Sequence, residues 1–332
     1  MDMLYKSVGD AVNKFKSGLK EDTFKQLLNK DGTVNKEATE EAVKRAFPDI
    51  TPRTMTRNRN DEKVIKELKE TKFEELYKNL LKYKISGKDN FTTLIEKWFN
   101  RKDSEKTEPE FDTFHHEACE TVIEFLKAAG YDDESCAYGK AQKVVNMTFK
   151  HLYCMDGALC LCSAKSFEYC HMALDSFTLE WLKRTKDNGQ SNIKKGMVDS
   201  WSAIQNPYDN SNEEPGFQEC YKKINKKGKV DEFYSYNTLV GFIRNVIPEK
   251  EYKDLTPFQA EFFIWPEIQL HMAAEALYFF DMDEMKAGKV SVDQAKKQFK
   301  MESLSEKLKL VKNTVDKLLK EYSSGNSTTN NA

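Results

Sequence analysis

The sequence lacks the short motifs that identify several large enzyme classes. It contains no P-loop, no Gly-x-Gly-x-x-Gly dinucleotide fingerprint, no Gly-x-Ser-x-Gly nucleophile elbow and no His-Glu-x-x-His zinc motif. These absences argue against P-loop nucleotide hydrolysis, Rossmann-type redox chemistry and α/β-hydrolase catalysis. We therefore expect no cofactor.

Long apolar runs are also missing. No stretch approaches the roughly 18 apolar residues that a membrane-spanning helix needs. The first residues, MDMLYKSVGDAVNKF, do not contain the apolar segment of a signal peptide. We expect a cytoplasmic protein that makes no contact with a membrane.

Arginine is scarce, with 7 Arg against 45 Lys, and the net charge is only −2. Such a balance gives no overall field that would draw the chain to nucleic acid, so a binding surface would have to be a local patch. The planar fork of an arginine side chain fits phosphates and base edges, so a cluster of arginines is more informative than a cluster of lysines.

Paired cysteines are absent as well. The seven cysteines are odd in number and include no Cys-x-x-Cys pair, whereas zinc sites usually show such pairs. Buried, reduced thiols are therefore expected, and no metal. Histidines and cysteines that could serve a metal site do occur between residues 115 and 171. They are His115, His116, Cys119, His151, Cys154, Cys160, Cys162, Cys170 and His171.

Strand signals are few and helical periodicity is common, which predicts an all-α, multi-helix protein. Residues 61–83 are expected to form one long charged helix. The segment RKDSEKTEPE, residues 101–110, has no apolar side chain and predicts a linker. It would separate a small N-terminal helical domain, residues 1–100, from a larger aromatic-cored domain, residues 111–322. The polar tail, residues 323–332, is expected to be disordered.

Apolar residues between 301 and 322 recur at alternating steps of three and four, the pattern of a coiled-coil seam. Two interpretations remain open. The segment either docks on its own domain as a terminal helix or pairs with a second copy to form a homo-oligomer. Three heptads are short for a coiled coil, which favours docking.

One segment carries residues suited to chemistry. A short turn with Gly139 leads into an apolar helix that bears Lys140 and Lys143, in the sequence AYGKAQKVVNMTFKHLYC. About thirty residues later, Asp175 stands where a second helix begins. The structural alternative is that Asp175 or Ser176 caps this helix and that the lysines are solvated, because Asp at a helix start is what capping alone predicts.

The order of these features resembles the helix-hairpin-helix DNA glycosylases, particularly their archaeal-type branch, over residues 138–181. The resemblance implies that Lys140 or Lys143 attacks the sugar C1′ and forms a Schiff base, with Asp175 as its carboxylate partner. Such a lysine needs a depressed pKa to act as a nucleophile. The Leu-Pro-Gly-Val-Gly hairpin of that family is absent, and the acidic AAGYDDESCAYGK stands in its place. The segment also resembles uncharacterised helical proteins of bacterial genomes and mobile elements.

Two basic patches predict contact with nucleic acid, although a solvated charged surface is the alternative for both. The first would lie on the second helix of a helix-turn-helix that begins with residues 36–46. Its arginines are Arg53, Arg57 and Arg59. The second is KKINKKGK, a predicted loop that would hold phosphates as point charges. Its lysines are Lys222, Lys223, Lys226 and Lys227.

Two functions follow from the sequence as hypotheses. The first is a non-catalytic helical protein that binds a protein or nucleic-acid partner, in phage defence or in conflict with a mobile element. The second is a glycosylase/lyase that uses Lys140 or Lys143 together with Asp175. Fold class alone does not decide between them, because function resides in particular sites rather than in a fold.

Overall fold

The computed structural model describes residues 5, 7–19, 24–50, 55–58, 64–68, 71–84, 89–158, 161–187, 190–191, 193–194, 196–209, 216–225, 227–247 and 252–279. The chain forms two compact units, Lys6–Phe262 and a second that is mainly Phe263–Ala332. The heptad segment 301–322 and the tail 323–332 lie outside the described residues.

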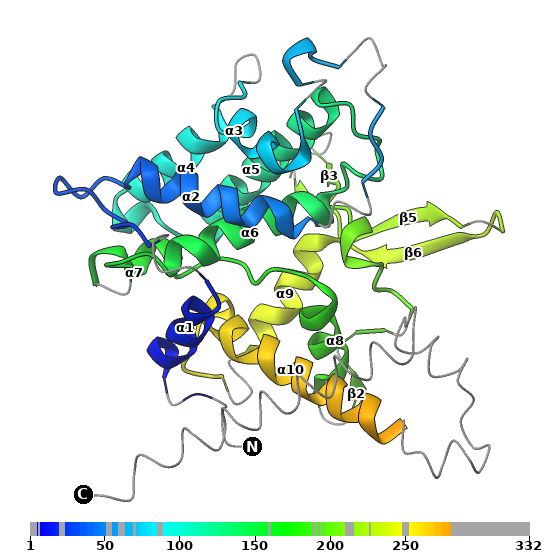
Figure 1. Cartoon of the computed structure of the whole chain (residues 1–332). Helices are drawn as coiled ribbons and strands as arrows, with labels where there is room; N and C mark the ends of the chain where they lie inside the picture. The colour runs from blue at the N-terminus through cyan, green and yellow to red at the C-terminus, as the bar shows by residue number, and fades with distance from the viewer. Residues whose placement is uncertain are drawn as a thin grey trace, which may run out of the picture. The chain divides into compact units, whose positions relative to one another are not determined.

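Helix α6 (Tyr138–Tyr153) runs through the interior of the first unit, since 14 of its 16 residues are buried. It packs against α2 (Lys36–Ala46) and α5 (Glu108–Ala128), and α4 (Phe91–Asn100) packs against α5 (Figure 1). Asparagine side chains cap α2 and α4 by accepting backbone N–H groups of their first turns. Helix α2 spans the residues predicted for it, and α6 is the predicted helix that bears Lys140 and Lys143, so these two predictions are confirmed.

The remaining described elements are shorter or lie later in the chain. The α-helices are α1 (Val8–Ser17), α3 (Leu76–Leu80), α7 (Leu161–Phe167), α8 (Ser176–Arg184), α9 (Tyr236–Val246) and α10 (Pro257–Phe279). The 3-10 turns are η2 (Phe47–Asp49), η4 (Lys66–Leu68), η5 (Phe73–Glu75), η6 (Asp103–Glu105) and η7 (Trp201–Ala203). Among the described helices, none is long and apolar enough to cross a bilayer.

The core is aromatic, as the composition predicts. Trp98 of α4, Phe111 of α5 and Phe149 of α6 are buried and meet edge to face, with ring centroids 5.0 Å apart for Trp98–Phe111 and 5.6 Å for Phe111–Phe149. Trp98 precedes residues 101–110 and the other two rings follow them. The predicted domain boundary therefore lies inside the first compact unit, where its charged residues form η6 and the first turn of α5.

The chain is mostly helical, but the all-α prediction is too strict, because the described residues also form three antiparallel strand pairs. They are β1 (Lys186–Asp187) with β2 (Gln190–Ser191), β3 (Tyr208–Asp209) with β4 (Gly216–Phe217), and β5 (Cys220–Ile224) with β6 (Val230–Tyr234). The β5–β6 hairpin includes part of the predicted basic loop. Its turn is fixed by Asn225, whose side chain accepts the backbone N–H groups of Lys227 and Lys229.

The single long helix predicted over residues 61–83 is wrong. Within the described part of this stretch, η4, η5 and α3 follow one another as separate short elements. The Leu68 carbonyl accepts the Thr71 N–H, a bond of the tighter 3-10 type, and the Arg57 guanidinium donates to the carbonyl oxygens of both Leu68 and Thr71. Arg57, which precedes the stretch, thus contributes to the break.

Candidate functional site

Lys143 and Asp175 meet in the structure, although they lie 32 residues apart in the sequence. The Lys143 Nζ donates to the Asp175 Oδ2 at 2.8 Å, and the two side chains are 13% and 10% exposed. The sequence left Lys140 and Lys143 as equal candidates for this pairing. The structure places Lys143 against the carboxylate.

The capping geometry of α8 fixes the Asp175 carboxylate. Its Oδ1 accepts the backbone N–H groups of Phe177 and Thr178 at 2.9 and 3.1 Å, and its own N–H donates to the Thr178 hydroxyl at 2.8 Å. This reciprocal capping box holds Oδ1 on the helix N-terminus and leaves Oδ2 for Lys143. The predicted capping role of Asp175 is confirmed.

The extended segment that leads to Asp175 is held by long polar side chains. Gln142 of α6 donates to the Leu174 carbonyl at 2.7 Å and accepts the Leu174 N–H at 3.2 Å. Glu261 of α10 accepts the Ala173 N–H at 2.8 Å. Because these groups are buried, each bond also satisfies a backbone group that would otherwise be costly to desolvate. The segment therefore delivers Asp175 to α6 in a fixed position.

An aromatic ring borders the pair because Gly139 has no side chain. A Cβ on Gly139 would lie 1.8 Å from the Trp201 carbonyl oxygen, and the Gly139 N–H donates to the Ile204 carbonyl at 2.8 Å. The close approach brings η7 onto the start of α6. As a result the Lys143 Nζ lies 5.2 Å from the centroid of the Trp201 ring.

Lys140 has different surroundings. It lies in the first turn of α6, and its Nζ donates to the Glu134 carbonyl oxygen at 3.1 Å. Burial lowers the pKa of Lys140, while the nearby Asp132, Cys136 and Glu134 act in the opposite direction. Helical side chains lean toward the N-terminus, which directs a first-turn lysine back past the helix start.

A second ion pair lies seven residues further along α6. The Lys150 Nζ donates to the Glu261 Oε1 at 2.6 Å, and these side chains are only 5% and 3% exposed. The rings of Phe15 and Phe262 lie 5.0 and 4.8 Å from the Lys150 Nζ. Burial also raises the pKa of Asp49, against the opposing effect of Lys143 and Lys150. The face of α6 that follows Lys143 is thus a buried row of charges.

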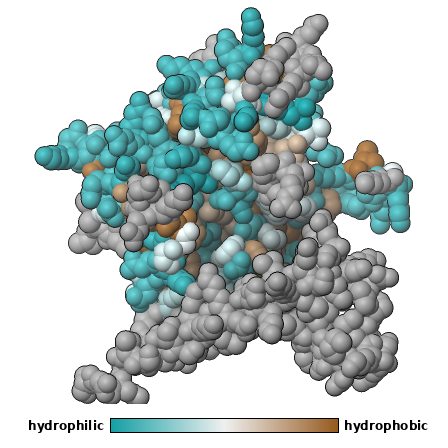
Figure 2. Space-filling model, in the orientation of Figure 1, coloured by the Kyte–Doolittle hydropathy of each residue, from teal (hydrophilic) through white to brown (hydrophobic). Residues whose placement is uncertain are grey.

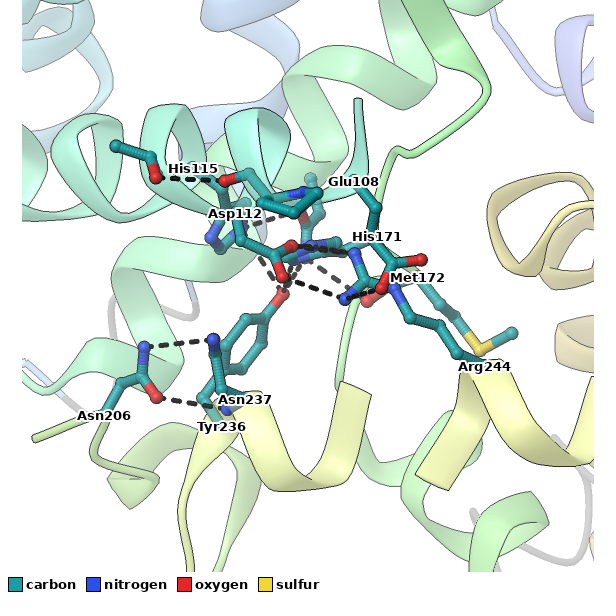
Figure 3. Close-up of polar contacts among 12 residues, drawn as sticks. Glu108, Asp112, His115, His171, Met172, Asn206, Tyr236, Asn237 and Arg244 are labelled. Atoms are coloured by element: carbon teal, nitrogen blue, oxygen red, sulfur yellow. Dashed lines mark hydrogen bonds and ion pairs between the residues drawn. The ribbon is translucent and has the colours of Figure 1, made fainter. Parts of the chain in front are cut away.

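A buried network of histidines and tyrosine joins α5, α6 and α9 (Figure 3). The Asp112 carboxylate receives two hydrogen bonds from Arg244, at 2.9 and 2.7 Å, and lies 2.7 Å from the His171 Nε2. The His171 Nδ1 lies 3.0 Å from the Tyr236 hydroxyl, which accepts the Asn146 side-chain N–H at 2.9 Å.

The network continues through His115. Its Nε2 lies 3.0 Å from the Asn146 Oδ1, and its Nδ1 lies 3.2 Å from the Tyr138 hydroxyl. Neutral imidazoles that carry their proton on Nε2 satisfy all of these contacts, because each Nδ1 then accepts a tyrosine O–H. Burial lowers the pKa of both His115 and His171, in accord with neutral rings. The network braces α6 and places the residues around Lys143.

The arginine patch predicted as a helix-turn-helix reader is not helical where it is described. Residues 55–58 carry an isolated bridge between Arg57 and Tyr131, and Arg53 and Arg59 lie outside the described residues. Arg57 donates to the carbonyls of Ala129, Thr71 and Leu68. Its guanidinium is therefore engaged with the backbone of its own chain.

The lysine patch falls on the β5–β6 hairpin. Lys223 donates to the Asp199 carboxylate at 2.5 Å and to the Ala203 carbonyl at 2.8 Å, so it anchors the hairpin. Lys222 and Lys227 are exposed and make no ion pair within the described residues. Lys226 lies outside the described residues.

Four of the described cysteines are buried thiols, and Cys220 is half-buried. Cys119, Cys136, Cys154 and Cys170 are free and buried, and burial raises the pKa of both Cys136 and Cys154 to about 12. Such thiols stay protonated near neutral pH and are poor metal ligands. No group of three or more His, Cys, Asp or Glu side chains is placed to hold a metal ion within the part of the chain that the structure describes.

Sequence reasoning missed the residues that position the pair, above all Gln142, Asn146, Glu261 and the Asp112–Arg244 pair. One signal was present: Gln142, Asn146 and Lys150 recur at steps of four on an otherwise apolar helix, which indicates a polar stripe on a buried face. Comparison with protein-family models, with curated proteins and with solved structures gave no match.

Proposed function

We propose that this protein acts on nucleic acid as a lysine-dependent glycosylase/lyase, with Lys143 as the nucleophile and Asp175 as its carboxylate partner. The observation that supports the proposal is the 2.8 Å contact between the two groups in a site only 13% and 10% exposed. Hydrogen-bond reach between an amine and a fixed base is the geometry that an activated lysine requires.

The chemistry follows from the two groups. Asp175 takes a proton from Lys143, and the neutral amine attacks C1′ of a nucleotide. The N-glycosidic bond breaks as the Nζ–C1′ bond forms, and the base leaves with the bonding electrons and takes a proton. The C1′–O4′ bond then breaks as one Nζ proton passes to O4′, which gives a protonated imine. Loss of a C2′ proton from this species expels the 3′ phosphate and breaks the strand, which is the lyase step. Water hydrolyses the protonated imine and restores the lysine side chain.

The surroundings of the pair suit such a substrate. The Trp201 ring is half-buried and close to Lys143, so it offers a face on which a base can stack. Asp175 keeps its orientation through the capping box, so the loss of the lysine proton does not require the carboxylate to move.

A second candidate is a non-catalytic protein that binds a protein or nucleic-acid partner. It is favoured by a specific observation: both oxygens of Asp175 are already used, one on the α8 N-terminus and one on Lys143. In that case the ion pair serves only to tie α8 to α6.

Borohydride trapping separates the two candidates. The protein is incubated with duplexes that carry an abasic site or a modified base, the imine is reduced, and the adducted lysine is mapped by peptide mass spectrometry. The proposal predicts an adduct on Lys143 that Lys143→Gln and Asp175→Asn abolish and that Lys140→Gln retains. Because an abasic aldehyde reacts with any accessible amine, adducts spread over surface lysines, and unchanged by Lys143→Gln, favour the binding protein.

A further inference from the structure

The β5–β6 hairpin extends from the body of the first unit as a two-stranded ribbon (Figure 1). Tyr221 and Lys223 lie on one face of β5 and hold the base of the hairpin. The Tyr221 hydroxyl and the Lys223 Nζ both donate to the Asp199 carboxylate, at 3.2 and 2.5 Å. The register pairs Ile224 with Val230 next to the turn. A firm base therefore supports a protruding tip.

The tip carries an apolar pair in water. Ile224 is 76% exposed and Val230 54% exposed, and with Tyr208 they are the exposed large hydrophobic residues of the described chain. The two side chains are cross-strand partners, so they form one small apolar knob. Figure 2 shows an exposed apolar patch on this projecting hairpin. Paired aliphatic side chains at a projecting turn contribute nothing to the core of the unit.

Positive charge surrounds this knob. Lys222 lies on the same strand face as Ile224, two residues away, and Lys227 and Lys229 flank the turn. All three lysines are exposed and make no ion pair within the described residues. Of the two acidic residues of β6, Asp231 accepts a hydrogen bond from Asn225, and Glu232 is exposed opposite Lys222. The three lysines outnumber the exposed carboxylate of Glu232.

We propose that the hairpin tip, defined as residues 222–225 and 227–230, binds duplex nucleic acid, with Lys222, Lys227 and Lys229 on phosphates and the Ile224–Val230 knob against a base step. A two-stranded ribbon fits a groove of B-form DNA, and aliphatic wedges between base steps are a recurrent device of proteins that bend duplexes. Charge complementarity selects a polyanion as the partner. A single acyl chain attached to a protein binds membranes only marginally. The two aliphatic side chains of the knob bury far less hydrocarbon than such a chain, so a lipid surface is disfavoured as the partner.

The inference goes beyond the proposed chemistry and does not depend on it. An intact duplex without an abasic site has nothing for Lys143 to trap, so binding to it reports on the hairpin alone. Hairpin variants should still give the Lys143 adduct at saturating DNA, whereas Lys143→Gln should still bind the intact duplex.

The test is fluorescence anisotropy of the full chain with a labelled intact duplex over a series of salt concentrations. The double variant Ile224→Ser/Val230→Ser should weaken binding about tenfold. Lys227→Gln/Lys229→Gln should lower the slope of log affinity against log salt by about two. Ile224→Leu/Val230→Leu keeps the knob apolar, and Lys36→Gln/Lys102→Gln changes the charge equally at exposed sites elsewhere; both controls should bind like the unchanged protein.

Three results would overturn the inference. The first is that the unchanged protein does not bind the duplex. The second is that the tip variants bind as tightly as their controls. The third is capture by vesicles of phosphatidylserine and phosphatidylcholine that the serine variant abolishes while duplex affinity is unaltered, which would assign the tip to a membrane instead.

Discussion

Two lysines on one face of α6, Lys143 and Lys150, form ion pairs that differ in how deeply they are buried. Lys143 and Lys150 both pair with a carboxylate, at 2.8 and 2.6 Å. Lys143 keeps 13% of its side chain exposed beside Trp201, whereas Lys150 is enclosed by Phe15 and Phe262 at 5%. The Lys143–Asp175 pair is therefore less deeply buried than the Lys150–Glu261 pair. Under the proposed function, the first pair reacts with a substrate and the second only supports the fold.

The largest expected loss of stability comes from breaking the enclosed pair. Lys150→Met leaves Glu261 buried without its cation and should lower the free energy of unfolding by about 3–5 kcal/mol. The double variant Lys150→Met/Glu261→Gln should regain much of that loss, because no charge is then left unpaired. Urea unfolding measures both, and a double variant that is no more stable than Lys150→Met would contradict this account of the pair.

Acid should destabilise the enclosed end of α6 next. Burial, aided by Arg45 and Lys150, lowers the pKa of His151 to about 3 from an ordinary value of 6.5. Below pH 6.5 the His151 side chain is protonated in the unfolded chain but stays neutral in the folded chain. Stability therefore falls as the pH drops from 6.5 toward 3.

Between pH 7 and pH 4 this residue should account for a loss of roughly 2–3 kcal/mol. His151→Leu should flatten that part of the pH profile, as measured by urea unfolding at each pH. His115 and His171, whose pKa values burial also lowers, will keep a residual slope in the same direction. An unchanged profile in His151→Leu would rule His151 out as a source of the slope.

Near the Lys143–Asp175 pair, Gly139→Ala should lower the free energy of unfolding, although replacing glycine by alanine within a helix usually raises it. The new Cβ would lie 1.8 Å from the Trp201 carbonyl oxygen, so we expect a loss of about 1–3 kcal/mol. Gly241→Ala in α9 meets no atom within 4 Å and should instead gain up to about 1 kcal/mol. If both variants are stabilised, Gly139 does not set the approach of η7.

Lys143→Gln should have the smallest effect on stability, about 1–2 kcal/mol. Asp175 still caps α8 through Phe177 and Thr178 after the change, so its charge is not left without partners. Urea unfolding beside Lys150→Met makes the comparison direct. A loss as large as that of Lys150→Met would mean that the two pairs have the same structural role.

Much of this site could be predicted from the sequence because it rests on local rules. The helix over residues 36–46 and the helix that bears Lys140 and Lys143 follow from helical periodicity, and the cap at Asp175 follows from an acidic residue before SFTLEWL. The meeting of a lysine of α6 with Asp175 was expected on the same grounds together with the family resemblance.

The rest depends on contacts between distant residues. Lys140 and Lys143 differ by less than one helical turn, and only the packing of the segment 172–174 selects Lys143. Arg57 contributes from outside to the break in the expected helix over 61–83, and Glu261 meets Lys150 from 111 residues away. The β5–β6 hairpin was missed because its many lysines conceal the alternation of Tyr221 and Lys223 against Lys222 and Ile224.

Peptide mapping of the borohydride-reduced adduct is the most direct test of the proposed role of Lys143. If Lys143 is the nucleophile, the modified peptide contains this residue, and the adduct disappears in Lys143→Gln while the variant still unfolds cooperatively. Lys150 and Lys140 should remain unmodified. Adducts confined to exposed lysines, or an undiminished yield in Lys143→Gln, would show that the pair ties α8 to α6 and performs no chemistry.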